Sequence, residues 1–593
     1  MSLLPPGELG QRRNVLALAA LAALCLIGIF DRGLWTPDEP READIAWNMS
    51  QQSDRLVPHL AGTPFLEKPP LTYWLAGSVI RASSSTAAVF ARAPNLLYAA
   101  LTAVAVIALA LAMGAADGVG GVAAALMAAL IAQSALLGYR VSIWLAPDAA
   151  LLAGCAIALF GAYYGYSSPP GGRKLLGYTV MHAGAALGFL AKSAPGWLVP
   201  LLALGTLIVW ERRWRELLRW ELYAGVILQA LLIAPWLIAL ARSPEGPGDL
   251  KVLFWHNLVG RFTQVSAPAA LDYTLAHRNS PGKYLLELPV GLLPWTVLVV
   301  AGLASAWSRA RGAAPQSTAW RFAIASSLPF LLVLSFAATA RDVYAAPALI
   351  GLASLVALWC GRDEEAWSRG DAIALTLTGV LVSLTVLLLS AALVILAIEN
   401  VPGAPRAVYV LCAAGTLAAA ACGVWFGWRA QRARAFAAAT LALFTGYAGA
   451  LCLVALASFP VVDRWQNLAG LATQIRRETA GGDLALLGPD ETTLAMMDYG
   501  SSHRPVVLSP PPGETSQTVG TWLAAHGLRS RVLVLMPGHA PGELSALLKR
   551  WHHPEDDEDG PAGQIVEDGS ARIVKQYALP HGRRYALLGP LSR

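Results

Sequence analysis

Seven ionisable side chains stand close together in residues 35–74, directly after the first apolar stretch of the chain. They are Asp38, Glu39, Arg41, Glu42, Asp44, Glu67 and Lys68. Ionisable groups at a membrane face are costly unless they are paired or take part in chemistry, so this cluster indicates a functional site. The alternative is a solvated loop that joins two helices. The length of the segment and its many Pro, Trp and Tyr residues argue against that alternative.

More charged residues are predicted to reach the same side of the membrane. Asp148 lies in a short turn between two apolar stretches, and Lys192, Arg261 and Arg341 lie at the ends of other stretches or in loops. Lys and Arg hold phosphate oxygens, and a carboxylate can orient or deprotonate an acceptor. Transfer of a sugar from a lipid phosphate fits this set, because fixed cations stabilise the charge that grows on the leaving phosphate.

Apolar stretches of bilayer length predict a polytopic α-helical membrane protein. Hydrophobic residues make up 56% of the chain and charged residues 14%, which excludes an ordinary soluble protein. A membrane-spanning helix needs about 20 apolar residues. About thirteen spans are predicted, at 14–30, 94–113, 118–138, 149–166, 176–191, 194–210, 222–241, 285–307, 321–338, 343–360, 371–397, 406–426 and 434–459.

Charge bias predicts the orientation of these spans, since Lys and Arg concentrate in cytoplasmic loops. If Arg12 and Arg13 are cytoplasmic, basic turns recur at alternate connections, near 173–174, 212–219 and 429–434. The N-terminus would then be cytoplasmic and residues 460–593 would lie in the periplasm of a bacterial inner membrane. The net charge of +6 is explained by this topology, so no nucleic-acid partner is expected.

Three segments are predicted on the periplasmic side. Loops 31–93 and 242–284 are expected to form the active site of a transmembrane domain, 1–459, and the first loop is expected to contain a helix over 42–49. Residues 460–593 alternate between helical and strand patterns, which predicts a small α/β domain. Its helices are expected over 465–479 and 521–527, and its strands over 483–487, 505–508, 531–536 and 572–577.

The loop motifs carry a family resemblance. PDEPREADIAWNM (37–49) and LVPHLAGTPFLEKPPLTYW (56–74) resemble the first external loop of the bacterial 4-amino-4-deoxy-L-arabinose lipid A transferases, the ArnT-like enzymes. These belong to the C-type membrane glycosyltransferases, as do the protein O-mannosyltransferases. The similarity continues, in order, through LGFLAKSAPGWLVP (187–200), FWHNLVGRF (254–262) and ARDVYAAPAL (340–349). It implies a GT-C fold of thirteen spans with an external C-terminal domain, and a polyprenyl-phosphate sugar as donor.

The resemblance also implies roles for particular residues. The catalytic carboxylates would be Asp38, Glu67 and Asp148. The substrate-binding residues would be Arg41, Lys68, Lys192, Arg261, Arg341 and Tyr344. Glu67 and His256 would be the ligands if a divalent metal takes part, and no cofactor is otherwise required. Phe65 departs from the family, which often has Tyr there, and this bears on the identity of the sugar or acceptor.

Structural alternatives exist for several of these residues. Asp38 and Arg41 could form a helix cap with its ion pair, and Lys192 could extend its ammonium to the interface. Arg341 could be an interfacial anchor, and His256 a hydrogen-bonded histidine of the interface. Each of these roles would be fulfilled without a substrate.

The leading hypothesis is a monomeric inner-membrane glycosyltransferase. It would move a sugar, with 4-amino-4-deoxy-L-arabinose as the candidate, to a periplasmic acceptor with inversion; lipid A phosphate is the expected acceptor, and a protein or another glycan is the alternative. A transporter or flippase of a lipid-linked substrate is a competing class. It is disfavoured because few ionisable residues lie in the middle of the spans and no repeat relates the two halves. A non-catalytic assembly or sensor protein would leave EKPPLTYW (67–74) unexplained.

Overall fold

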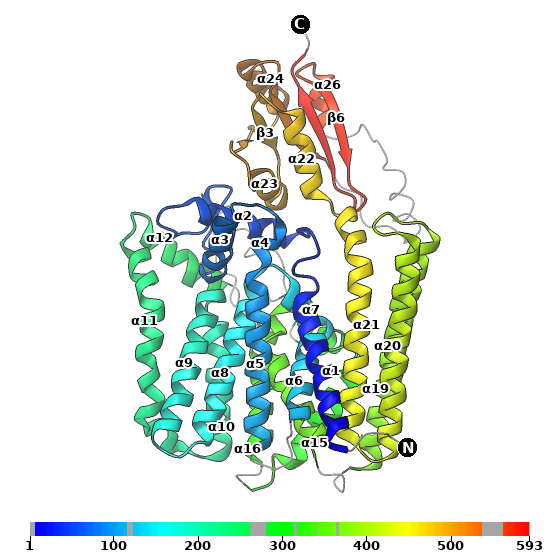
Figure 1. Cartoon of the computed structure of the whole chain (residues 1–593). Helices are drawn as coiled ribbons and strands as arrows, with labels where there is room; N and C mark the ends of the chain where they lie inside the picture. The colour runs from blue at the N-terminus through cyan, green and yellow to red at the C-terminus, as the bar shows by residue number, and fades with distance from the viewer. Residues whose placement is uncertain are drawn as a thin grey trace.

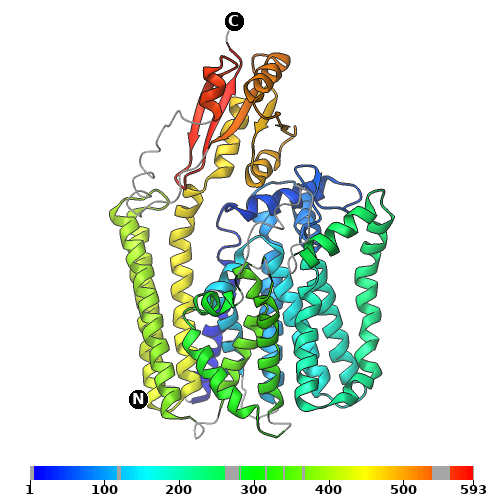
Figure 2. The same ribbon diagram turned by 180° about the vertical axis from the view of Figure 1, so that it is seen from behind.

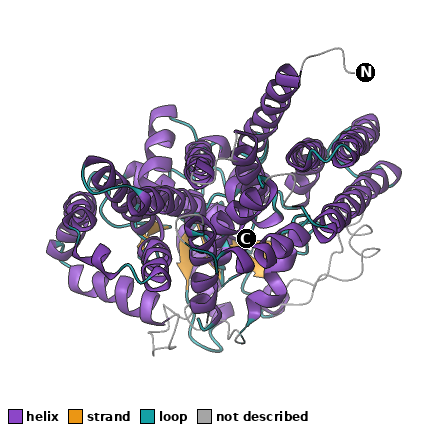
Figure 3. Cartoon of the chain, turned by 90° about the horizontal axis from the view of Figure 1, so that it is seen from below, coloured by secondary structure: helices purple, strands orange, loops and turns teal. Residues whose placement is uncertain are grey.

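The computed structural model of this chain describes residues 6–115, 122–260, 280, 282–313, 317–337, 339, 341–362, 367–536 and 561–591. Long helices run side by side as a bundle, and a smaller unit of helices and strands lies beyond one end of it (Figure 1, Figure 2). We call this end of the bundle, where α2 (Asp38–Gln51), α3 (Leu71–Ser83) and α12 (Gly246–Lys251) lie, the upper end. Helices predominate throughout, as a view along the bundle shows (Figure 3).

The bundle helices follow the apolar stretches of the sequence. They are α1 (Pro6–Leu26), α5 (Pro94–Ala115), α6 (Val122–Ser134), α7 (Leu136–Ile143), α8 (Pro147–Ser167), α9 (Gly172–Lys192), α10 (Pro195–Glu211), α11 (Trp220–Arg242), α14 (Lys283–Gly291), α15 (Thr296–Arg309), α16 (Thr318–Ala325), α17 (Leu328–Ser335), α18 (Ala348–Cys360), α19 (Arg369–Ile398), α20 (Arg406–Arg432) and α21 (Phe436–Trp465). Within the described residues, seven helices are long and apolar enough to cross a membrane, or nine if each strongly bent pair is one span. The chain is therefore a membrane-embedded helical protein, and the count of thirteen spans stays a prediction.

Two predicted spans are broken in the structure. The stretch predicted at 118–138 contains α6, followed by a 72° bend into α7, and the stretch at 285–307 is divided into α14 and α15 with a bend of 117°. Pro294 stands between α14 and α15. Proline has no backbone N–H and clashes with the preceding helical turn, which explains why a helix ends there. The apolar pattern alone did not reveal these bends, because hydropathy does not register backbone direction.

Close packing of α8 against α9 fixes the positions of two charged residues. The two helices approach through glycines: a Cβ atom added at Gly161 would lie 2.3 Å from the Met181 backbone nitrogen. Small residues allow such close approach between membrane helices. Because the two helices are consecutive and packed together, the first turn of α8 and the last turn of α9 meet at the upper end. These turns carry Asp148 and Lys192, respectively.

The first loop folds as a buried cap over the upper end. Helix α2 begins at Asp38, four residues before the start of the predicted helix, and Asp38 and Glu39 occupy its first turn. Carboxylates in a first turn stabilise a helix through its dipole, which explains the earlier start. The short strands β1 (His59–Leu60) and β2 (Thr63–Pro64) pair antiparallel before α3, and α4 (Ala88–Arg92) follows.

Glu39 is the structural carboxylate of this loop. It is fully buried and accepts hydrogen bonds from Arg32 Nη1 at 2.6 Å, Arg32 Nη2 at 2.8 Å and Arg92 Nε at 3.3 Å. The backbone nitrogens of Trp35 and Leu145 also donate to it, at 2.7 Å and 2.8 Å. A buried charge is stable only when it is paired and hydrogen-bonded. Glu39 therefore ties the loop to the bundle and is not directed towards a substrate.

Residues beyond α21 form the smaller unit. Its helices are α22 (Leu468–Glu478), α23 (Glu491–Asp498), α24 (Thr515–His526) and α26 (Pro561–Glu567). Its strands are β3 (Leu484–Leu487), β4 (Val506–Leu508), β5 (Arg531–Met536), β6 (Arg572–Ala578) and β7 (Arg584–Gly589), in the order β4-β3-β5-β7-β6. Strand β3 runs parallel to β4 and β5, whereas β7 is antiparallel to β5 and β6. Four strands lie where the sequence pattern predicted them; α23, α26 and β7 were not predicted.

The smaller unit and the first loop share an apolar core. Ala43 and Ala46 of α2 are buried in one cluster with Leu471 of α22 and with Met496 and Met497 of α23. Burial of such side chains contributes about 25 cal/mol per Å² of apolar surface, so this contact joins the two parts.

Candidate active site

Eight of the ten site residues predicted from the sequence line one cavity at the upper end, with a volume of about 290 Å³. They are Asp38, Arg41, Glu67, Lys68, Asp148, Lys192, Arg341 and Tyr344. Glu42 and Arg140 also line it. Arg261 lies outside the described residues, and His256 is not among the lining residues. The convergence of separate segments, which the sequence could not establish, is the central feature of this site.

Lys68 is held over the cavity by a carboxylate of α2. Its Nζ donates to Glu42 Oε1 at 2.7 Å, and the hydroxyl of Tyr73 donates to Glu42 Oε2 at 2.8 Å. Burial alone would lower the pKa of Lys68, but the charges of Glu42 and Glu67 raise it above its ordinary value. The ammonium therefore stays protonated and available to an anion.

Arg41 lies within reach of four carboxylates. Its Nη1 is 2.8 Å from Glu491 Oε2, and its Nη2 is 3.3 Å from Asp38 Oδ1. The same Nη2 is 3.8 Å from Glu42 Oε1 and 4.0 Å from Glu67 Oε2. Sequence reasoning missed Glu42 and Glu491 as site residues. Glu42 carried a signal, since it follows Asp38 by four positions and shares its helix face.

Asp38 is clamped by an arginine from the other side of the cavity. Arg341 donates from Nη2 to Asp38 Oδ2 at 2.9 Å and from Nη1 to Asp38 Oδ1 at 3.2 Å. Burial would raise the pKa of Asp38, but the hydrogen bond and charge of Arg341, with Arg41 and Lys68, lower it below its ordinary value. Asp38 is therefore an ionised carboxylate of fixed orientation.

Asp148 and Lys192 form the second pair. Lys192 Nζ lies 2.5 Å from Asp148 Oδ1 and 4.0 Å from the centre of the Tyr344 ring. A carboxylate at a helix start and a cation at a helix end both interact favourably with helix dipoles, and an aromatic face attracts an ammonium. The pair is thus held at the cavity wall by α8, α9 and the 3₁₀ helix η4 (Asp342–Ala345).

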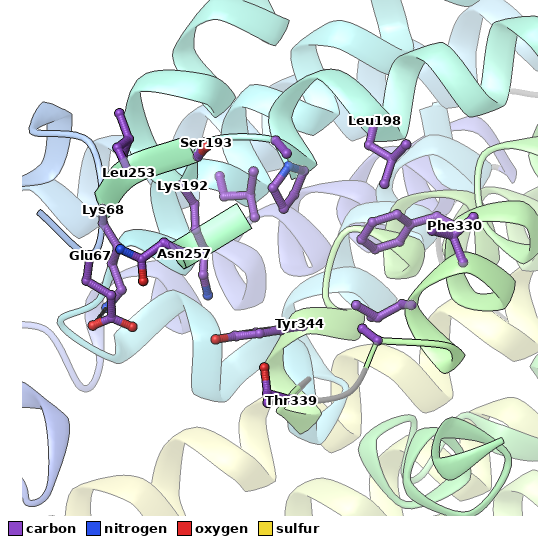
Figure 4. A pocket seen from close by; sticks show the side chains of 16 residues that line it. Glu67, Lys68, Lys192, Ser193, Leu198, Leu253, Asn257, Phe330, Thr339 and Tyr344 are labelled. Atoms are coloured by element: carbon purple, nitrogen blue, oxygen red, sulfur yellow. Dashed lines mark ion pairs between the residues drawn. The ribbon is translucent and has the colours of Figure 1, made fainter. Parts of the chain in front are cut away.

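An apolar cavity of about 100 Å³ adjoins the charged one. The two share Glu67, Lys68, Lys192, Thr339 and Tyr344. In Figure 4, the carboxylate and ammonium groups gather at one end, whereas Leu198 and Phe330 lie at the other. A charged cavity that continues into an apolar cavity suits an amphipathic ligand with an anionic head.

Several buried polar atoms of the two cavities have no hydrogen-bond partner among the described residues. They are Arg41 Nε, Ser193 Oγ, Asn257 Oδ1 and Thr339 Oγ1. Buried polar atoms are almost always paired, so their concentration here indicates that a ligand or water completes the site.

Glu67 and His256 are the ligands that the resemblance implies for a divalent metal. Nδ1 of His256 in the π-helix η2 (Val252–Val259) is buried and has no partner among the described residues, as a metal ligand would. Glu67 Oε2, however, faces Lys68 and Arg41 at 3.9 Å and 4.0 Å, and no group of three or more His, Cys, Asp or Glu side chains gathers in the described part of the chain. The described residues therefore do not form a recognisable metal site.

Phe65, the departure from the family motif, places its ring 5.6 Å from the Arg41 guanidinium.

The structure has the GT-C fold of the solved ArnT structures. The chain superposes on the crystal structure of ArnT from Cupriavidus metallidurans bound to undecaprenyl phosphate with a TM-score of 0.69, over 97% of both chains at 18% identity. The apo structure of the same protein gives a TM-score of 0.69 at 17% identity.

The family resemblance inferred from the loop motifs is also confirmed. Residues 15–244 match the dolichyl-phosphate-mannose-protein mannosyltransferase family. The undecaprenyl phosphate-alpha-4-amino-4-deoxy-L-arabinose arabinosyl transferase of Pseudomonas aeruginosa is 29% identical over 370 residues, which are 58% of this chain and 58% of that protein. A second transferase of this name from Sodalis glossinidius is 30% identical over 62% of this chain and 63% of its own length. The chain thus spans less than two thirds of these relatives.

Proposed function

We propose that this protein is a membrane glycosyltransferase that moves a sugar from a polyprenyl phosphate to an acceptor at the upper end of the bundle. The observation that carries the proposal is the convergence of five cations and four carboxylates in one cavity beside an apolar one. The similarity to undecaprenyl phosphate-aminoarabinose transferases supports the same reaction class.

The donor would lie across both cavities. Its phosphate would lie between Lys68, Arg41 and Lys192, and the first isoprene units would extend along Leu198 and Phe330. Arg and Lys suit this task because their charge and hydrogen bonds match phosphate oxygens. The names of the relatives make 4-amino-4-deoxy-L-arabinose the candidate sugar.

The reaction would be a single displacement with inversion. The acceptor oxygen would form a bond to the anomeric carbon while the bond from that carbon to the phosphate oxygen breaks, and the phosphate would leave with the electron pair. Cations aimed at the leaving phosphate stabilise this transition state; removing one such group typically costs about 3–4 kcal/mol. An acceptor hydroxyl would pass its proton to Asp38, whereas an ionised acceptor phosphate would need no base.

The proposal also covers the acceptor and the orientation of the protein in the membrane. We take lipid A phosphate as the first candidate acceptor. The basic turns of the sequence favour a cytoplasmic N-terminus in a bacterial inner membrane, with the cavity and the α/β unit in the periplasm. Residues 1–459 would then act as the transferase domain and residues 460–593 as a periplasmic α/β domain.

A transfer assay with a donor and acceptor panel tests this function. Purified protein in liposomes is incubated with several undecaprenyl-phosphate sugars and with lipid A, a peptide or an oligosaccharide, and all products are followed by mass spectrometry. We expect one acceptor to gain the sugar while undecaprenyl phosphate is released. Movement of the lipid-linked sugar between leaflets without any transfer would instead identify a flippase.

A further inference from the structure

The geometry points to Glu491, in the C-terminal α/β unit, as a positioning residue that aims Arg41 into the reaction cavity. This inference rests on the proposed function and deepens it, because it makes the α/β unit a working part of the donor-phosphate site. It assigns the unit a role that follows from contacts between α23 and α2.

The contact itself is a direct ion pair. Glu491 Oε2 lies 2.8 Å from Arg41 Nη1, the shortest of the four carboxylate distances around this guanidinium. The two residues stand 450 positions apart in the chain. Such charge-assisted hydrogen bonds are stronger than neutral ones and fix the plane of an arginine.

Glu491 acts from behind the cavity wall. Asp38, Arg41, Glu42 and Glu67 line the cavity, whereas Glu491 is not among the lining residues. With Nη1 held by Glu491, the rigid guanidinium directs Nη2 towards Asp38 and the cavity. Glu491 would thus orient Arg41 without touching the substrate.

The position of Glu491 is fixed within the α/β unit. It is the first residue of α23, whose N-cap is the Asp490 side chain, which accepts from the Thr493 backbone nitrogen at 2.9 Å. Arg583 donates to both oxygens of Asp490, at 2.6 Å and 3.0 Å, and Thr493 Oγ1 lies 2.9 Å from Tyr585 Oη. The start of α23 is therefore anchored to the segment that leads into β7.

Helix α23 is also aligned along α2. Beside the first contact, Thr492 Oγ1 donates to the carbonyl of Pro37 at 3.1 Å. Seven residues further along both helices, Asn48 Nδ2 donates to Asp498 Oδ2 at 3.0 Å. Contacts at both ends hold the two helices side by side and in the same direction, so the α/β unit sets where Glu491 meets Arg41.

A binding experiment on the full-length protein tests this role. The Kd for undecaprenyl phosphate is measured in lipid nanodiscs for the wild type and for Glu491→Gln, Arg41→Gln and the double variant. We expect Glu491→Gln to weaken binding about tenfold, a typical loss when a hydrogen bond between charged groups is removed. In the Arg41→Gln background, the same change should alter Kd by less than about twofold, because Glu491 acts through Arg41.

Glu478→Gln is the matched control. Glu478 also lies in the α/β unit, forms a 2.9 Å pair with Lys575, and is 41% exposed, against 43% for Glu491. It should leave Kd unchanged. An unaltered Kd in Glu491→Gln, an effect that persists fully in the Arg41→Gln background, or an equal loss in Glu478→Gln overturns the positioning role. A wild type that does not bind undecaprenyl phosphate overturns the proposed donor, and the two failures are therefore distinguishable.

Discussion

Asp38 and Arg341 stand 303 positions apart in the chain and meet through two hydrogen bonds in the lining of the charged cavity. One residue starts α2 in the first loop, and the other directly precedes η4 in a later connection. Their pairing joins these two segments in the wall of the cavity. It also keeps the Asp38 carboxylate ionised and fixed at the place where an acceptor would approach.

Asp38→Asn should reduce transfer at least about 100-fold, as for the loss of one preorganised electrostatic group. Initial rates with saturating donor and acceptor measure this, and Asp54→Asn, an exposed carboxylate of the same loop, is the control. The pKa of Asp38 in the folded protein lies below its ordinary 3.8. The carboxylate is therefore ionised at pH values above 3.8, and its contribution to the transfer rate should be lost only as the pH falls through this lowered pKa. Equal rates for Asp38→Asn and wild type would remove Asp38 from the mechanism.

Glu39→Gln should destabilise the fold strongly. It would leave Arg32 and Arg92 buried without their countercharge, and breaking a buried ion pair typically costs about 3–5 kcal/mol. Thermal unfolding in detergent measures the loss, with Glu399→Gln, at the exposed residue that directly follows α19, as control. A melting temperature like that of the wild type would contradict the structural role assigned to Glu39.

Asp44→Asn should stabilise the contact between α2 and α23 at neutral pH by about 1 kcal/mol, the size of one hydrogen bond. Asp44 and Asp498 both accept from Asn48 Nδ2, at 3.2 Å and 3.0 Å, and Arg504 is the nearby cation. Burial, and then the charge of Asp498, raise the pKa of Asp44 well above 3.8. Its protonated form therefore stabilises the fold at low pH, and this stability is lost as the pH rises through the raised pKa.

The measurement for Asp44 is the melting temperature as a function of pH. In the wild type, the melting temperature should decline as the pH rises above the ordinary pKa of Asp. This decline should be smaller in Asp44→Asn, because the Asn side chain cannot ionise. Asp568→Asn, an exposed carboxylate of the α/β unit, should leave the curve unchanged. A lower melting temperature for Asp44→Asn at neutral pH would show that the ionised form is the stable one.

Gly161→Ala should loosen the α8–α9 contact and separate Asp148 from Lys192. The added Cβ would lie 2.3 Å from a backbone nitrogen, and overpacking of this kind costs about 1–3 kcal/mol. Transfer rate and melting temperature should both fall. Gly205→Ala on α10 is the matched control, because its Cβ would meet no atom within 4 Å. Similar behaviour of the two variants would refute the packing argument.

The sequence predicted the helical bundle and most of the charged cavity, but not the partners that complete it. Hydropathy located the apolar helices, since burial in a bilayer is a property of single segments. It did not reveal the break at Pro294, where the chain turns while remaining apolar. Glu42 could have been predicted as a site residue from its helical spacing from Asp38.

Glu491 could not have been found in this way. Helix α23 is only eight residues long, and its apolar pattern is too short to distinguish from a loop. Its contact with Arg41 depends on how the α/β unit packs against α2, which local patterns do not determine. The motifs around residues 37–74 were informative for the opposite reason, because five lining residues of the cavity come from this one continuous segment: Asp38, Arg41, Glu42, Glu67 and Lys68.

The most direct test of this account is the rate at which purified protein in liposomes releases undecaprenyl phosphate from its 4-amino-4-deoxy-L-arabinose conjugate in the presence of lipid A. We predict release matched mole for mole by aminoarabinose on lipid A, and its loss in Asp38→Asn and in Lys192→Gln. Release and transfer that persist in both variants would contradict the assignment of this cavity as the active site.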